Sequence, residues 1–169
     1  FLLWGCSDGW SFVPDGPLGR LIPVVVFRSS NALSGPHAVV MDVNAGRPLR
    51  EGGYSDAFLG RLGAHELASI DASNYGGASI VHDLNSPLSR SLVRKYSVVI
   101  DGGTLEHIFD FPNAIRNCME MLEVGGHFFS HTMANNILGH GFYQFSPELF
   151  YRVFSAETGF RINRMIPFE

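Results

Sequence analysis

The part of the sequence that most constrains the fold is a short apolar run followed by glycines and ionisable residues, SVVIDGGTLEHIFD at residues 97–110. Residues 98–100 are β-branched and apolar, which is typical of a central strand buried on both faces. The following Asp-Gly-Gly triplet allows the backbone to turn sharply. Because open α/β sheets bind their ligands at the carboxyl ends of strands, Glu106 and His107 are candidate site residues.

Length and composition indicate one globular domain. The chain has 169 residues, of which 46% are hydrophobic and 17% charged, and it is long enough to bury a single core. The net charge of −4, without a Lys/Arg cluster, argues against a nucleic-acid partner. Only Cys6 and Cys118 are present, without CxxC spacing, so we expect a reduced, cytoplasmic protein.

The N-terminal region shows no membrane or export signal. The apolar run at residues 21–27 is interrupted by Pro23 and is far too short to span a bilayer, so no membrane partner is expected. The chain starts at FLLWG without an initiator Met, which we interpret as a piece of a longer product. No basic stretch or cleavage pattern indicates a signal peptide. Nothing in the sequence indicates the oligomeric state.

Strand and helix patterns alternate along most of the chain. Residues 1–37 are rich in Gly and Pro and are expected to form an irregular arm, in which residues 24–27 could form one strand. The α/β domain is expected at residues 38–169. Its strands are predicted at residues 38–43, 66–73, 78–82, 97–100, 127–132 and 160–166, and its helices at 54–62, 111–124 and 146–154. This alternation predicts a Rossmann-like, doubly wound, mostly parallel sheet with helices on both faces.

The predicted helices carry recognisable ends. Asp110 can cap the second helix, with Pro112 in its first turn, and the glycine pair at residues 125–126 is expected to end it. Ser146 followed by Pro147 predicts the start of the third helix.

Four predicted strands end in a carboxylate, namely Asp42, Asp71, Asp83 and Asp101. Because the carboxyl ends of parallel strands lie at one edge, these acids are expected to line one crevice. An acid after the second strand suits a ribose diol, and one after the next strand suits an adenine amino group. Any single Asp is more often a cap or turn former, but the ordered set favours a site.

Several sequence blocks together resemble a known family. They are IDAS at residues 70–73, IVHDLN at 80–85, VVIDGGTLEHIFDFPNAIRNCMEML at 98–122 and EVGGHFFSHT at 123–132. From about residue 38 onward the chain resembles the small-molecule branch of the class I S-adenosylmethionine-dependent methyltransferases. The resemblance implies a further hairpin after Glu169, so we expect the sheet to be truncated at the C-terminus.

The resemblance also implies cofactor contacts. Asp71 would hold the ribose, Asp83 and Leu84 would flank the adenine, and Asp101 with Gly102 would lie beside the methionine portion. The acid and close-spaced glycines that such enzymes carry after the first strand have split candidates here: Asp42 and Gly46, or Gly52 and Gly53. The absence of GxGxxG argues against a nicotinamide dehydrogenase.

Candidate catalytic and acceptor-binding residues follow from the chemistry of methyl transfer. This reaction depends mainly on alignment, and a hydroxyl acceptor benefits from a base of near-neutral pKa, for which His107 and His131 are the candidates. The residues expected to bind a small polar acceptor, such as a sugar or other polyol, are Glu106, Asn135, Asn136, His140 and Tyr143. The plainer alternative is that His107 braces the adjacent helix and Tyr143 packs.

A metal site is not favoured by the sequence. His127, His131 and His140, with Asp101 nearby, could in principle bind zinc or support a magnesium-dependent acceptor site. However, no HxH or HExxH spacing occurs, and a histidine on a buried strand face is more often a core residue. No Asn-Pro-Pro-Tyr sequence follows the fourth strand, so an amino-group acceptor is not expected.

Two hypotheses therefore stand. The first is an S-adenosylmethionine-dependent methyltransferase that acts on a small polar molecule at oxygen. The alternative, favoured by the split glycine loop, is a non-catalytic methyltransferase-like domain that binds a nucleotide or a protein partner.

Overall fold

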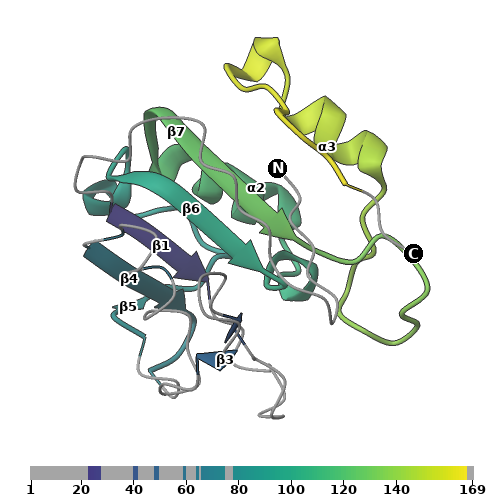
Figure 1. Cartoon of the computed structure of the whole chain (residues 1–169), viewed down its shortest axis with the longest axis horizontal. Helices are drawn as coiled ribbons and strands as arrows, with labels where there is room; N and C mark the ends of the chain where they lie inside the picture. The colour runs from purple at the N-terminus through teal and green to yellow at the C-terminus, as the bar shows by residue number, and fades with distance from the viewer. Residues whose placement is uncertain are drawn as a thin grey trace.

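The chain has a mixed α/β architecture (Figure 1). The structure is a computed structural model that describes residues 59, 64, 66–74 and 78–166, and the backbone of residues 23–27, 40–41 and 48–49. Among the described residues, no helix is long and apolar enough to cross a membrane.

Five parallel strands form the main sheet. They are β1 (Pro23–Phe27), β4 (Glu66–Asp71), β5 (Ile80–Val81), β6 (Tyr96–Gly102) and β7 (Leu122–His131), and their spatial order is β5-β4-β1-β6-β7. After β1 the chain adds β4 and β5 on one side, and then β6 and β7 on the other. Phe27 is in register with both Ile70 and Asp101, so the carboxyl ends of β1, β4 and β6 are level at one edge.

The central strand differs from the prediction. The segment expected as the first strand, residues 38–43, contributes only β2 (Val40–Met41), which pairs antiparallel with β3 (Pro48–Leu49) outside the main sheet. Its place is taken by β1, from the region expected to be an irregular arm. Both segments are short apolar runs that periodicity alone does not distinguish. Proline is tolerated at the first position of a strand, so Pro23 does not prevent β1 from pairing on both sides.

The predictions for β4, β5 and β6 are confirmed in position. β4 ends at Asp71 as expected, whereas β5 is shorter than its predicted range. β6 extends the predicted strand at both ends and places the fully buried Val99 in the core.

Helix α2 (Phe111–Met121) lies against one face of the sheet beside β6 and β7 (Figure 1). The Asp110 side chain caps it by accepting a 3.2 Å hydrogen bond from the Asn113 N–H, as the sequence predicted. Its buried face consists of Phe111, Ala114, Ile115, Asn117, Cys118 and Met121. Of the helix predicted at residues 54–62, only Leu59 is described, and it is helical and buried.

The glycine pair does not end α2, contrary to the prediction. The helix stops at Met121, and Gly125 and Gly126 belong to β7, where the pairing with β6 shifts register between Tyr96 and Val98. Gly125 has a φ of +85°, and a Cβ on Gly126 would lie 3.0 Å from the Ser97 carbonyl oxygen. The glycines are therefore needed for a strand irregularity and a close backbone approach, which local sequence does not distinguish from a helix end.

The C-terminal region confirms one prediction and contradicts another. Helix α3 (Pro147–Val153) begins as expected, with the Ser146 hydroxyl accepting from the Glu148 N–H at 3.2 Å. Residues 160–166 were expected to form a strand, but they form none in the described structure. Burial still follows the alternation of apolar and polar residues, because Phe160 and Ile162 are half-buried while Arg161 and Asn163 are exposed. Packing on the core, including a Phe154–Phe160 ring contact at 5.8 Å, accounts for that alternation without a strand ladder.

Candidate functional site

Two of the predicted carboxylates lie at the level edge where the parallel strands end. Asp71 is the last residue of β4, and Asp101 precedes the last residue of β6. Both side chains are buried, at 6% and 1% exposure. Buried carboxylates are uncommon unless they are well bonded or have a role at a site.

Asp101 is held by three donors. Its Oδ1 accepts from the N–H groups of Thr104 (2.8 Å) and Leu105 (3.3 Å), and its Oδ2 accepts from the Ser130 hydroxyl (2.7 Å). These bonds fix the turn that leads from β6 into the 3-10 helix η2 (Leu105–His107). Burial nevertheless raises the pKa of Asp101 to about 6, because desolvation disfavours its charged form more than the hydrogen bonds favour it.

Asp71 and Asp83 lie at neighbouring strand ends. Asp71 Oδ1 accepts from both the N–H (2.8 Å) and the hydroxyl (3.1 Å) of Ser73. Asp83 is exposed and follows β5, where its Oδ1 accepts from the N–H and the side-chain amide of Asn85. These bonds from Asn85 lower the pKa of Asp83, so this carboxylate is ionised at neutral pH.

The residues predicted beside these acids have different environments. The Leu84 side chain is buried in the core, and its carbonyl accepts from the side-chain amides of Asn113 (2.9 Å) and Asn117 (3.2 Å). Gly102 is exposed at the end of β6, and a Cβ there would meet no atom within 4 Å. Gly102 pairs with His131, so strand alternation places this open space on the face opposite the buried Asp101 side chain.

Glu106 is the most enclosed ionisable residue near this edge, with a side chain that is 0% exposed. Its Oε2 accepts a 3.0 Å hydrogen bond from the Thr132 hydroxyl. Its Oε1 is buried without a hydrogen-bond partner. Leaving a buried carboxylate oxygen without a donor is costly, so this oxygen is a candidate for binding a cation.

The backbone of the loop after β7 folds back onto η2. The Glu106 carbonyl accepts from the N–H groups of Phe142 (2.7 Å) and Tyr143 (3.3 Å). Gly141 adopts a φ of +67°, and a Cβ there would lie 2.7 Å from the same carbonyl oxygen. Glycine is therefore required at this contact, which brings His140 over η2.

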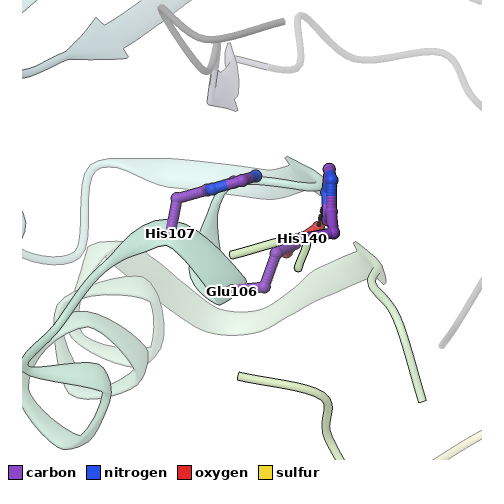
Figure 2. A group of neighbouring side chains, drawn as sticks. All are labelled: Glu106, His107 and His140. Atoms are coloured by element: carbon purple, nitrogen blue, oxygen red, sulfur yellow. Dashed lines mark ion pairs between the residues drawn. The ribbon is translucent and has the colours of Figure 1, made fainter. Parts of the chain in front are cut away.

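Figure 2 shows the resulting cluster of Glu106, His107 and His140. His140 Nε2 lies 3.8 Å from Glu106 Oε1, and the two imidazole rings meet edge-to-face with centroids 4.7 Å apart. One possible ligand atom from each of the three residues lies within 4.8 Å of the others. In the described part of the chain, this is the one group of three or more His, Cys, Asp or Glu residues with that property.

His131, the second predicted base, is not part of this cluster. It ends β7 opposite Gly102, and strand alternation directs it to the face opposite Ser130. Burial lowers the pKa of His131 to about 4, so its imidazole is neutral and weakly basic at pH 7. Both predicted bases are half-buried, and only His107 belongs to the cluster.

The remaining predicted acceptor residues divide into two kinds. The Tyr143 hydroxyl donates a 2.6 Å hydrogen bond to the Phe109 carbonyl, and its ring stacks on Phe145 with centroids 5.7 Å apart. Asn135 and Asn136 are exposed on the same loop. The other predicted cofactor residues, Asp42, Gly46, Gly52 and Gly53, lie outside the described residues.

Sequence reasoning missed several residues near the cluster. Ser130 and Thr132 donate hydroxyl hydrogen bonds to Asp101 and Glu106, respectively. Their alternate positions at the end of β7 could have predicted that both side chains lie on the same face of the sheet. Phe109 and Phe142 are 71% and 64% exposed and form an edge-to-face pair at 5.7 Å. Paired exposed aromatic rings are typical of a binding surface, and nothing local in the sequence indicated that these two meet.

The arrangement combines buried carboxylates at strand ends with a glutamate–histidine cluster on the adjoining helical turn. No protein-family model matches the sequence, and neither curated proteins nor solved structures gave a match. The geometry therefore carries the functional argument. It offers anionic groups for a polar or cationic ligand and imidazoles for proton transfer or metal binding.

Proposed function

We propose that the chain is an S-adenosylmethionine-dependent methyltransferase that acts on a small polar acceptor at oxygen, and that its sheet is of the Rossmann-like doubly wound type. The strand order β5-β4-β1-β6-β7 supports the fold proposal, because the chain builds outward from β1 in one direction and then in the other. Numbered by their order within this sheet, the strands run 3-2-1-4-5, as in doubly wound nucleotide-binding sheets.

The observation that carries the functional proposal is the position of Asp71 and Asp101. In doubly wound sheets, ligands bind beyond the carboxyl ends of the strands where the winding reverses, which here is between β1 and β6. Asp101 pairs in register with Phe27, the last residue of β1, and Asp71 ends the strand on the other side of β1. Two buried acids thus flank the proposed ligand position.

These residues fit the proposed cofactor chemically. Asp71 would accept from the ribose hydroxyls, Asp83 from the adenine amino group and Asp101 from the ammonium of the methionine portion, while Leu84 would contribute backbone. The desolvated carboxyl of Asp101 supports this, because a cationic ligand beside it would favour the charged carboxylate. When bound, S-adenosylmethionine supplies an electrophilic methyl group.

On the acceptor side, we assign the base role to His107. It would take the proton from the acceptor hydroxyl, while His140 and the exposed loop residues Asn135 and Asn136 hold the acceptor. Glu106, predicted as an acceptor-binding residue, is fully buried and would act by orienting His140. The His107 ring lies edge-to-face against the His140 ring, with centroids 4.7 Å apart. A cytoplasmic, reducing location is part of the proposal, because the chain has only two cysteines and no CxxC spacing.

Isothermal titration calorimetry with S-adenosylmethionine and S-adenosylhomocysteine tests the proposal. We expect saturable binding, and the Asp71→Ala and Asp83→Ala variants should each lose roughly 1–3 kcal/mol of binding free energy, the cost of removing a charged hydrogen-bond partner. Glu148→Ala is the matched control, because this exposed carboxylate pairs with Arg152 on α3 and not with the strand ends. Absence of binding by the wild type, or unchanged affinity in both Asp variants, would refute the placement of the cofactor. Binding without methyl transfer would favour the non-catalytic alternative.

A further inference from the structure

We propose that Glu106, His107 and His140 form a binding site for a divalent transition-metal ion of the zinc type. The proposal stands on the geometry of these three side chains and does not depend on the methyltransferase assignment. The histidine spacing did not predict it, because the three residues come from η2 and from a loop more than thirty residues later.

The distances between the ligand atoms suit a metal site after a small adjustment. Zinc bonds to His nitrogen and carboxylate oxygen are about 2.1 Å, so two ligand atoms in a tetrahedral site lie about 3.4 Å apart. His140 Nε2 and Glu106 Oε1 are 3.8 Å apart, and all three ligand atoms lie within 4.8 Å of one another. The His140 side chain is 40% exposed, so its ring has room to rotate toward a bound ion.

A second, independent observation is the unpartnered oxygen of Glu106. This side chain is fully buried, and the oxygen that faces His140 accepts no hydrogen bond. Burying a carboxylate oxygen without a donor or a cation is strongly unfavourable. A metal ion at this position would satisfy the oxygen directly. A protonated His140 is the competing partner, and the experiment below separates the two.

The surroundings hold the ligands in place. The Thr132 hydroxyl binds the other Glu106 oxygen at 3.0 Å and so orients the carboxylate. The amide bonds from Phe142 and Tyr143 to the Glu106 carbonyl hold the loop that carries His140 over η2. Such outer contacts fix the orientation of metal ligands and contribute to metal affinity.

The donor set indicates the class of metal. Two imidazoles and one carboxylate suit zinc and related transition metals, whereas Mg²⁺ and Ca²⁺ prefer oxygen ligands. Three protein ligands leave a coordination position open, as in catalytic and not structural zinc sites. Because His107 and His140 are partly exposed, that position would face solvent. With an ion bound, His107 would be a metal ligand and not a base, so the base role proposed above applies to the metal-free protein.

Zinc binding to the full chain, first stripped with a chelator, tests the proposal. Competition against a chromophoric zinc indicator should give one high-affinity Zn²⁺ per chain, which a large excess of Mg²⁺ does not displace. His140→Ala and Glu106→Gln should each weaken that binding by more than about 100-fold. Substitution of residues that only contact the metal ligands already lowers metal affinity by about 10–100-fold, and these two residues are the ligands themselves. His127→Ala is the matched control, because it removes an exposed histidine from β7 and should leave the affinity unchanged.

Substitution with Co²⁺ gives a readout that a purely structural role would not produce. Wild type and His127→Ala should show the visible absorption of protein-bound Co²⁺, and His140→Ala should lose it. Far-UV circular dichroism identifies any variant that fails to fold, and Glu106→Gln keeps the side-chain volume and an acceptor for Thr132. Absence of Zn²⁺ binding by the wild type, or binding by folded His140→Ala as tight as wild type, would overturn the proposal in favour of a His140–Glu106 ion pair. Calorimetry with S-adenosylmethionine on chelator-stripped protein tests the cofactor proposal without zinc. The cofactor proposal and the metal proposal can therefore fail independently.

Discussion

The substitution Asp101→Asn should make the folded protein more stable at neutral pH. The Asp101 carboxyl is fully buried, and its pKa rises from 3.8 to about 6 because desolvation outweighs its hydrogen bonds. Each pKa unit corresponds to about 1.4 kcal/mol, so ionising this group in the folded state costs about 3 kcal/mol more than in the unfolded chain. Asparagine occupies the same volume without a charge and avoids that cost.

The hydrogen bonds of Asp101 reduce the expected gain. The side-chain oxygen of asparagine can accept from the Thr104 and Leu105 N–H groups, but its NH₂ group requires the Ser130 hydroxyl to act as acceptor. These neutral bonds are weaker than those to a carboxylate. The net expectation at pH 7 is a stabilisation of about 1–3 kcal/mol, or a rise in Tm of about 2–10 °C for a chain of this length.

The pH dependence fixes the sign of the effect. Because the folded-state pKa is raised, the folded protein binds more protons than the unfolded chain between about pH 4 and pH 6. The contribution of Asp101 to stability is therefore greatest below pH 4, is lost as the pH rises to about 6, and is constant above that. The advantage of Asp101→Asn over wild type should accordingly be largest at pH 7–8 and vanish near pH 4.

Urea unfolding of both proteins across pH 4–8 measures this difference. Asp83→Asn is the matched control, because bonds from Asn85 lower the pKa of Asp83 from 3.8, so its contribution is lost only below about pH 4 and should stay nearly constant across pH 4–8. If Asp101→Asn were less stable than wild type at pH 7, or if its advantage did not shrink below pH 6, the argument from desolvation would be wrong. The same variant should bind S-adenosylmethionine more weakly, so stability and ligand affinity should move in opposite directions.

Two further predictions concern packing. Gly126→Ala should destabilise the fold by about 1–3 kcal/mol in urea unfolding, because its Cβ would lie 3.0 Å from two backbone oxygens. In the control Gly102→Ala, the Cβ meets no atom within 4 Å, so its stability should stay within about 1 kcal/mol of wild type. Equal effects of the two substitutions would contradict the close approach at Gly126. Asn117→Ala should cost about 1–3 kcal/mol, because its buried amide donates to the carbonyls of Leu84 and Ser86, and a Tm unchanged in differential scanning calorimetry would refute this role.

Local sequence predicted the elements whose determinants are local. The apolar run at residues 98–100 and the Asp110 cap specify β6 and α2 by short-range pattern, and both were placed correctly. The choice of the central strand depends on which apolar run pairs with β4 and β6 on both sides. Two similar apolar segments compete for this position through long-range contacts, so the first strand was predicted at residues 38–43 and not at β1.

The candidate site was likewise predictable only where its determinants are local in sequence. Glu106 and His107 follow a buried strand and could be identified from that position alone. The approach of His140 depends on the positive φ of Gly141 and on its contact with the Glu106 carbonyl. No periodicity encodes such a contact between residues so far apart in sequence, so the cluster itself appears only in three dimensions.

The attachment of the loop after β7 has an evolutionary consequence. The bonds that hold this loop to η2 run from the backbone amides of Phe142 and Tyr143 to the backbone carbonyl of Glu106. Backbone bonds of this kind do not depend on side-chain identity, provided that Gly141 is kept. Exposed positions on the loop, such as Asn135 and the fully exposed Leu138, can therefore change without detaching it. A lineage could diversify the molecules that it accepts at these positions while the histidine and glutamate stay together.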